Sequence, residues 1–196
     1  MKYLYTVFIV LVLAACNTAN PKDIFSENEI QKSILINIDS LSRDSRTGWL
    51  KYDNQYFTGV ALKFYPNGNV QYQKSIENGI MNGFYISKFR NGQVNVQAKY
   101  KKGMRIGWSN VWFPNGQLKN KAFYKKGVVH GADSSWYVNG NLFKVRNLTG
   151  GVETGMQKAW RKNGKLFANY EAKHGRIFGL RNSSMCNKLE NETVKK

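Results

Sequence analysis

Few residues of this 196-residue chain could carry out acid–base or metal chemistry. It has two histidines, His130 and His174, which are 44 positions apart, and 12 acidic residues. Only four carboxylates lie between residues 56 and 179, and no two of them share a position of the repeat described below: Glu77, Asp133, Glu153 and Glu171. General acid–base catalysis needs titratable groups held within hydrogen-bond reach of the substrate. We therefore expect a protein that is not an enzyme and that holds no metal or cofactor.

Cys16 follows an N-terminal segment with the features of an export signal. Lys2 provides a positive charge, and Tyr3–Leu13 is an uncharged apolar run, too short to span a bilayer but of the length of a signal-peptide core. The residues from Leu13 to Cys16 read Leu-Ala-Ala-Cys, which resembles a bacterial lipobox. This resemblance implies cleavage after Ala15 and acylation of Cys16. An ordinary secretory signal or an uncleaved apolar N-terminus is the alternative.

The lipobox resemblance implies a protein anchored in the cell envelope by its acyl chains. Asn17 is not the aspartate that resembles an inner-membrane retention signal, so we expect the outer membrane where the cell has one. The predicted organisation is a signal peptide (1–15), the lipidated cysteine with a tether or cap (16–47), a repeat domain (48–179) and a C-terminal tail or cap (180–196).

Cys186 would be the sole thiol of the chain once Cys16 is acylated, so no intramolecular disulfide could form. Such a thiol is buried, joined to another chain, or a soft-metal ligand together with Met185 and His174. We expect burial, and a role in envelope metal or redox handling is the alternative.

An internal repeat of 24 residues sets the elements that would position any site. Five copies run from Tyr56 to Gly175 without insertion or deletion, and a sixth starts at Arg176 and matches as far as Gly179. Sixteen of the 18 glycines fall in three columns of this repeat. The first two columns contain the glycines predicted to form structural turns: Gly59, Gly83, Gly107, Gly131 and Gly155, then Gly68, Gly92, Gly116, Gly140 and Gly164.

Each copy is predicted to be a β-hairpin. The glycine of the second column always follows an asparagine, as in Asn67-Gly68. Asn-Gly tolerates positive φ at both central positions of a type I′ turn, which closes two-residue hairpins. A further glycine turn, such as the one at Lys101–Gly103, would join each hairpin to the next. Before the array, a strand is expected at Gly48–Tyr52, whereas residues 29–41 fit either a short helix or a strand.

Apolar and aromatic columns of the repeat indicate the buried face of these hairpins. The columns that begin with Val60, Phe64, Val70 and Ile76 are expected to share one face and to form a packing stripe. The Phe64 column continues as Lys88, Trp112, Trp136 and Trp160, and we expect it to be core, with a ligand platform as the alternative. The column of Tyr65 has the opposite parity, so either a bulge precedes the turn or these residues lie on the second face.

The repeats resemble MORN-repeat variants, and more closely the YwqK-type proteins that are often labelled antitoxin components. The resemblance rests on the aromatic-x-Asn-Gly-x-aliphatic core at Tyr65–Val70, Phe113–Leu118 and Tyr137–Leu142, and on Tyr-Lys-Lys-Gly at Tyr100–Gly103 and Tyr124–Gly127. It implies an all-β fold, an elongated antiparallel meander of about five hairpins in a single twisted sheet. Ten strands would make this sheet roughly 48 Å long. Residues 22–52 and 176–196 are the candidate caps for its ends.

The formal net charge of +18 is concentrated on the repeats. Residues 56–179 contain 20 Lys and Arg against four acids, which gives 20 − 4 = +16. The candidate binding residues are basic side chains at one edge, Lys101, Lys102, Lys125 and Lys126, and others in the later repeats, Lys119, Lys121, Arg161 and Lys162.

We expect this basic sheet to bind anionic lipid headgroups or an acidic envelope protein. A like-charged surface that keeps a long sheet soluble would explain the same residues. Nucleic acid is not an expected partner of an exported protein, and no feature points to a small-molecule substrate. An antitoxin or immunity-type module that sequesters a toxin is the alternative function.

Overall fold

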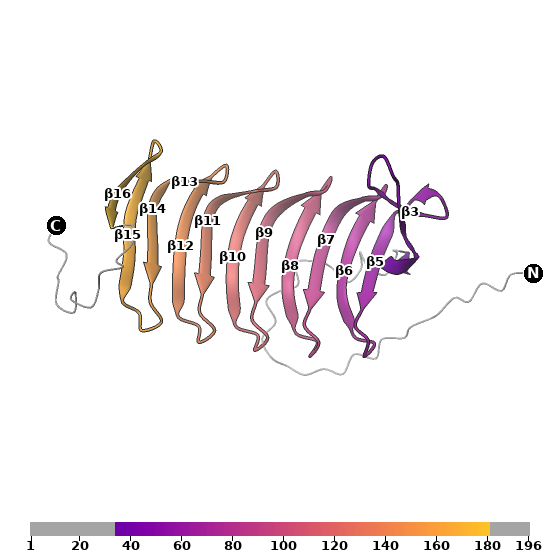
Figure 1. Ribbon diagram of the computed structural model, residues 1–196, viewed down its shortest axis with the longest axis horizontal. Helices are drawn as coiled ribbons and strands as arrows, with labels where there is room; N and C mark the ends of the chain where they lie inside the picture. The colour runs from indigo at the N-terminus through magenta and orange to yellow at the C-terminus, as the bar shows by residue number, and fades with distance from the viewer. Residues whose placement is uncertain (1–33, 181–196) are drawn as a thin grey trace, which may run out of the picture.

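The computed structural model describes residues 34–180 as an all-β protein (Figure 1). Cys16, Met185 and Cys186 lie outside the described residues. The main sheet has 13 strands, in the order β1-β5-β6-β7-β8-β9-β10-β11-β12-β14-β15-β16, with the short β13 paired to β12. In this part of the chain no helix is long and apolar enough to cross a membrane.

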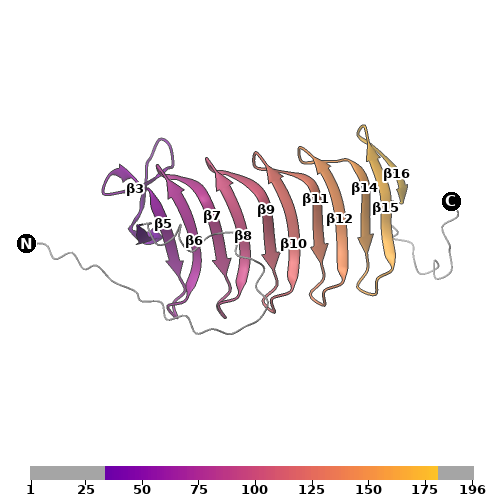
Figure 2. The ribbon, with the colours of Figure 1, turned by 180° about the vertical axis from the view of Figure 1, so that it is seen from behind.

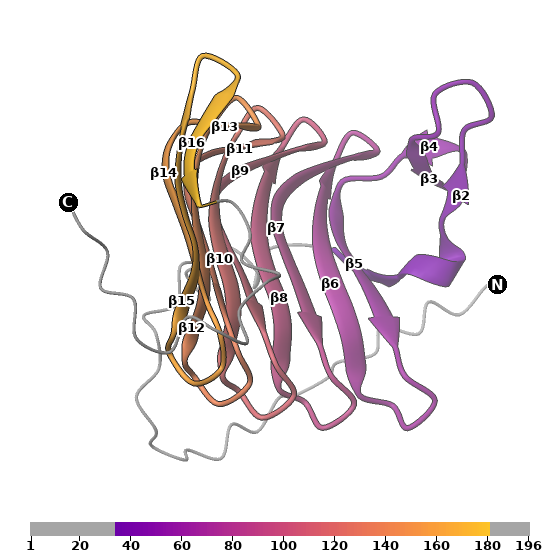
Figure 3. The same cartoon turned by 60° about the vertical axis from the view of Figure 1, so that its left-hand side comes forward.

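Ten strands of the main sheet form five antiparallel hairpins, one for each 24-residue copy, which confirms the predicted repeat fold. They are β5 (Gly59–Phe64) with β6 (Val70–Glu77), β7 (Ile80–Lys88) with β8 (Val94–Lys101), β9 (Met104–Trp112) with β10 (Leu118–Lys125), β11 (Val128–Trp136) with β12 (Leu142–Thr149), and β14 (Gly155–Trp160) with β15 (Leu166–Lys173). The sheet is twisted along its length, as the view from behind and the view turned by 60° show (Figures 2 and 3).

The main sheet contains one parallel strand pair, and a second, smaller sheet lies before the repeats in the chain. The first strand, β1 (Leu35–Asn37), pairs in parallel with β5. It is followed by a short 3₁₀ helix, η1 (Ile38–Ser40), so the segment that fitted helix or strand contains both. A second, three-stranded sheet consists of β2 (Ser42–Arg43), β3 (Leu50–Tyr52) and β4 (Gln55–Tyr56), and β3 confirms the strand expected before the repeats.

These N-terminal elements cap the first hairpin. Leu50, Phe57, Ala61 and Ile76 form a buried cluster against which η1 and β1 pack their aliphatic side chains. Asp44 holds the loop before β3, because its carboxylate accepts the backbone N–H groups of residues 46 and 47 and pairs with Lys51 at 2.6 Å. The Lys51 ammonium and these N–H groups keep the pKa of the Asp44 carboxyl well below its usual range.

The opposite end of the sheet is open in the described part of the chain. It is formed by β16 (Arg176–Leu180), the partial sixth copy, which pairs with β15 and has no second neighbour within residues 34–180. All five of its residues are exposed, and the exposed fraction of Phe178 is 53%. Within residues 34–180 the two ends of the array therefore differ: β5 has a partner strand on its outer side and β16 has none.

The Asn-Gly turns within the hairpins are not the expected type I′ turns. In the third copy Gly116 N–H donates to Phe113 O at 2.9 Å and Phe113 N–H donates to Gln117 O at 2.8 Å, which closes a three-residue loop. Gly116 has φ +84, whereas Asn115 is not among the residues with positive φ. This is a type I turn followed by a left-handed glycine. Pro114 favours it, because the first loop position of a type I turn suits proline.

Type I′ turns instead join one hairpin to the next. Asn78 and Gly79 have φ +50 and +79, and Lys102, Lys126 and His174 adopt similar left-handed conformations before their glycines. The predicted connecting turns are therefore confirmed, and they contain the turn type that was expected at the other edge.

The first glycine column is a second correction, because these residues are not in turns. Gly83, Gly107 and Gly131 lie inside β7, β9 and β11, and Gly59 and Gly155 begin β5 and β14. The three inner glycines have φ between +66 and +110, next to register shifts between their strands and the preceding ones. A Cβ on Gly83 would lie 2.7 Å from Ser75 Cβ. This column accommodates β-bulges, which often need a left-handed glycine.

The predicted packing stripe is split between the two faces of the sheet. Directly paired residues share a face: Phe64 pairs with Val70, but Ile76 pairs with Gly59 and not with Val60. The tryptophan face, as we name it, contains the columns of Val60, Phe64 and Val70, and the tyrosine face contains the columns of Ala61 and Ile76. The expectation of one stripe was wrong because the three-residue loop and the adjacent bulge change the parity of the second strand.

Candidate binding surface

Four of the predicted basic residues lie together at one edge of the sheet. Lys102 and Lys126 occupy neighbouring type I′ turns, and Lys101 and Lys125 are the last residues of β8 and β10 beside them. All four side chains are exposed. Equivalent turns are two strands apart, about 10 Å. We call this row the lysine edge, and it continues to the exposed Lys173 two hairpins further on.

The other four predicted residues lie elsewhere. Lys121 is on the tryptophan face, with its ammonium 4.7 Å from the centroid of a Trp108 ring. The Lys119 ammonium is 5.4 Å from the ring of Phe113. Arg161 and Lys162 belong to the Asn-Gly turn between β14 and β15, at the opposite edge. The eight residues therefore do not form one patch, and only the lysine edge gathers several of them.

Three of the four carboxylates of the repeats are engaged by other side chains, although Glu77, the last residue of β6, lies at the same edge of the sheet as the lysines. Asp133 pairs with Arg146, Glu153 accepts the Tyr170 hydroxyl at 2.8 Å, and Glu77 accepts the amide of Asn82. Residues 34–180 contain three salt bridges, and none of them includes a lysine of the lysine edge. Its positive charge is thus available to a partner.

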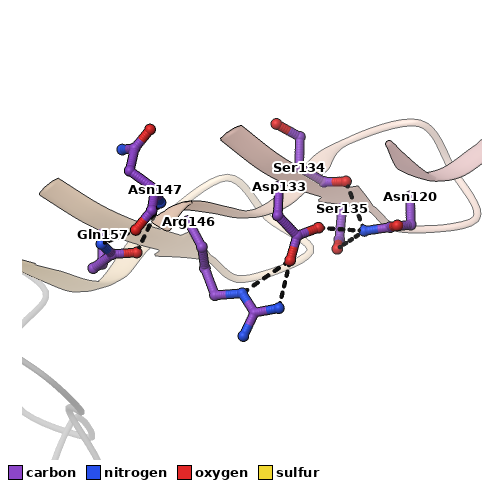
Figure 4. A network of polar contacts seen from close by, with 7 residues as sticks. All are labelled: Asn120, Asp133, Ser134, Ser135, Arg146, Asn147 and Gln157. Atoms are coloured by element: carbon purple, nitrogen blue, oxygen red, sulfur yellow. Dashed lines mark hydrogen bonds and ion pairs between the residues drawn. The ribbon is translucent and has the colours of Figure 1, made fainter. Parts of the chain in front are cut away.

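A buried polar network on the tyrosine face was not predicted (Figure 4). Asp133 has an exposed fraction of 3%, accepts the side-chain N–H of Asn120 at 2.6 Å and binds the guanidinium of Arg146. Asn120 also donates to Ser134 O and Ser135 Oγ. Because every charge has a partner, the network joins three neighbouring strands rather than offering a reactive carboxylate. A signal was present in the sequence, since Asp133 is the one acid of its column.

On the same face, the Gln157 side chain supplies hydrogen bonds where two neighbouring strands are not paired directly. Strands β12 and β14 pair directly only at Lys144 with Ala159 and at Val145 with Lys158. Beyond these pairs Gln157 Nε2 donates to Asn147 O at 2.9 Å, and its Oε1 accepts Asn147 N–H at 3.0 Å (Figure 4). The side chain thus replaces a backbone partner, and with an exposed fraction of 1% it is fully buried.

Beside Gln157 lies a hollow of about 220 Å³, lined in part by Arg146, Glu153, Ala159 and Tyr170. This is smaller than the clefts of about 300–1,000 Å³ that enclose typical ligands.

Tyrosines fill the tyrosine face of the earlier hairpins. The ring centroids of Tyr72 and Tyr85 are 6.1 Å apart, and those of Tyr85 and Tyr100 are 6.4 Å apart. Arg105 extends this row, because its Nη2 donates to the Tyr100 hydroxyl at 2.9 Å and its guanidinium lies 4.8 Å from the Tyr124 ring. Burial raises the pKa of Tyr85. These residues pack against one another.

The two histidines serve the turns of the lysine edge. His130 Nδ1 accepts Gly150 N–H at 3.4 Å, and His174 holds a left-handed turn position. Neither contacts the Asp133 network through a hydrogen bond. Among residues 34–180 no group of three or more His, Cys, Asp or Glu could hold a metal ion.

Comparison with known proteins gives no assignment: no family model matches the chain, and no curated protein matches it.

Proposed function

We propose that this protein is a lipid-anchored envelope protein whose repeat sheet is a non-catalytic module that binds anionic partners through the lysine edge. The lysine edge supports this most directly, because Lys101, Lys102, Lys125 and Lys126 are exposed and have no carboxylate partner in residues 34–180. Acidic lipid headgroups fit best, and an acidic envelope protein is the second candidate.

The backbone supports a role for these charges. Lys102 and Lys126 have φ +49 and +51, which costs a non-glycine residue about 1 kcal/mol. Asparagine or glycine is favoured at this position of a type I′ turn. Lysine at two successive turns therefore costs stability, and binding through the ammonium groups would explain why it is used there.

The position of the N-terminal segment favours lipid headgroups. Ile34 O accepts Val60 N–H at 2.8 Å, and β1 runs parallel to β5. The chain therefore enters the sheet at the Gly59 end of β5, on the side of the lysine edge. Eighteen positions separate Cys16 from Ile34, a reach of at most about 60 Å. An acylated Cys16 would tether the lysine edge close to the membrane surface.

Vesicle sedimentation tests this function. We would use the mature chain with Cys16→Ala, so that acyl insertion does not dominate, and vesicles of phosphatidylglycerol or of phosphatidylcholine. Binding to the anionic vesicles should fall as salt rises, because the Debye length is only about 8 Å at physiological ionic strength. Changing the four lysines of the lysine edge to glutamine should abolish most of the binding.

The matched control changes four other exposed lysines, Lys119, Lys121, Lys162 and Lys165, to glutamine. This variant loses the same charge and should keep most of its binding. Equal losses in the two variants, or binding that salt does not alter, would show that the lysine edge is not the site.

The anchor has its own test. Cys16→Ala should release the protein from membranes washed at high salt, which also weakens binding through the lysine edge, and intact-mass analysis of the wild type should show the acyl adduct.

A further inference from the structure

A column of tryptophans crosses the tryptophan face of three successive hairpins. Lys121 pairs with both Asn110 and Ser134, so these three residues share this face. Val145 likewise pairs with both Ser134 and Lys158. Side chains two residues apart on a strand point to the same side. The tryptophans that follow these positions by two residues therefore lie on one face: Trp112, Trp136 and Trp160.

This column is not the covered core that its spacing first indicated. The three tryptophans are half-buried, and no contact between two of their rings occurs in the structure of residues 34–180. Their direct partners are Leu118, Leu142 and Leu166, and Leu166 keeps an exposed fraction of 42%. The tryptophans therefore lie beside leucines of the partner strands and leave part of their surface to solvent.

The spacing of the column matches an extended sugar polymer. Successive tryptophans are two strands apart, about 10 Å, so three of them span about 20 Å along the sheet. In a β-1,4-linked polysaccharide every second sugar presents the same side, and its disaccharide repeat is close to this distance. Tryptophan is a large, rigid aromatic with one polar group, which suits the C–H-rich face of a sugar ring.

Basic residues beside the column add a preference for acidic sugars. Lys121 and Lys158 lie on the same face, and Lys88 occupies the tryptophan position in the second hairpin. We propose that the tryptophan face binds a β-1,4-linked polysaccharide with acidic substituents, laid across the strands with one disaccharide on each hairpin. This site is separate from the lysine edge and does not depend on lipid binding.

The length of the sugar oligomer is the variable that tests this proposal. Binding of N-acetylglucosamine oligomers with β-1,4 links would be measured by tryptophan fluorescence and calorimetry. Affinity should rise stepwise from the dimer to the tetramer and hexamer, as one, two and three tryptophans are engaged. Maltohexaose, whose α-1,4 links give a coiled chain, should bind at least tenfold more weakly. Equal affinity for all lengths would overturn the proposal.

Trp136→Ala removes the central ring and should weaken hexamer binding at least tenfold while leaving the dimer nearly unchanged. Trp49→Ala is the matched control, because Trp49 is partly exposed in the cap and lies outside the column. Trp136→Phe keeps an aromatic ring and should recover part of the affinity if Trp136→Ala proves poorly folded. Wild-type affinity in a folded Trp136→Ala protein would contradict the proposal.

The acidic preference is measured with two soluble β-1,4 glucans, carboxymethyl cellulose and uncharged hydroxyethyl cellulose. Lys121→Gln should weaken binding of the first and not of the second. Trp136→Ala should leave sedimentation with anionic vesicles unchanged, so a failure of this proposal is distinguishable from a failure of the lysine edge.

Discussion

Turns at both edges of the sheet contain a residue followed by glycine, but the turn type differs between the two edges. At the edge that contains Asn115-Gly116, which we call the asparagine edge, only the glycine has positive φ. At the lysine edge both residues do, as in Lys126-Gly127 with φ +51 and +84. The dipeptide alone therefore does not determine the turn, and the residues around it decide.

The edges also differ in what their side chains do. At the asparagine edge, side-chain amides connect neighbouring hairpins: Asn69 donates to Arg90 O, Asn91 to Pro114 O, Asn115 to Val138 O and Asn141 to Lys162 O. At the lysine edge the turns are held by backbone hydrogen bonds, such as Gly103 N–H to Met81 O at 2.8 Å, and by the side chains of Asn82 and His130, which accept turn N–H groups. The lysine side chains are thereby left for solvent or a partner. Both edges therefore contribute hydrogen bonds to the array, and the lysine edge in addition presents charge.

Proline substitution should separate the two edges most strongly. Lys126→Pro forces φ to about −65° where the turn needs +51, so we expect a loss of about 3 kcal/mol or more in the free energy of unfolding. Val138 holds the loop position that Pro114 holds in the third copy. Val138→Pro should therefore raise the free energy of unfolding by about 0.5–1 kcal/mol. Urea unfolding followed by circular dichroism measures both. A Lys126→Pro protein as stable as the wild type would refute the turn assignment.

Removing one turn asparagine should have a smaller effect. Asn115→Ala loses the acceptor of Gln117 N–H at 3.1 Å and the donor to Val138 O, and we expect a loss of about 1–2 kcal/mol. Asn163→Ala is the control, because Asn163 accepts Lys165 N–H and makes no hydrogen bond to another hairpin in the described residues. It should cost about half as much. If both variants lost the same free energy of unfolding in urea, the hydrogen bond from Asn115 to Val138 O would not stabilise the contact between hairpins.

The smallest effect should come from relieving the left-handed lysine. Lys126→Gly removes the strain at φ +51, partly offset by the greater freedom of unfolded glycine, so stability should rise by about 0.5 kcal/mol. Binding to anionic vesicles should fall in the same protein. Thermal unfolding measures the gain in stability, and vesicle sedimentation measures the loss of binding. A Lys126→Gly protein that is less stable than the wild type would argue against a stability cost of lysine at this turn.

The sequence was sufficient for the repeat and insufficient for its details. The period of 24 residues predicted five hairpins, because alternating strands and glycine turns recur without insertion. The type I′ prediction for Asn-Gly was wrong, because Pro66 and Pro114 at the preceding loop position favour type I. The strand parity was wrong for a related reason: a bulge of one residue reverses the faces, and the spacing did not place this bulge after the turn, in the second strand.

The lysine edge was predictable, because its residues recur at the same place in successive copies. The sequence marks Asp133 as the one acid of its column but does not show its partners, since Asp133, Asn120 and Arg146 come from three strands whose alignment depends on the bulges. Gln157 was missed for another reason. Its role arises where β12 and β14 lose their direct pairing, and only the folded chain shows that opening.

The difference between the two ends of the sheet bears on how such a chain could change length over evolution. The cap closes the outer side of β5 through β1, whereas β16 begins a sixth copy with its outer side open in the described residues. Since each hairpin mainly contacts its immediate neighbours, duplication of one 24-residue unit at the C-terminal end would leave the cap unchanged. Each duplication would add about 10 Å to the sheet. Gene duplication could therefore lengthen the sheet from its C-terminal end in steps of one hairpin.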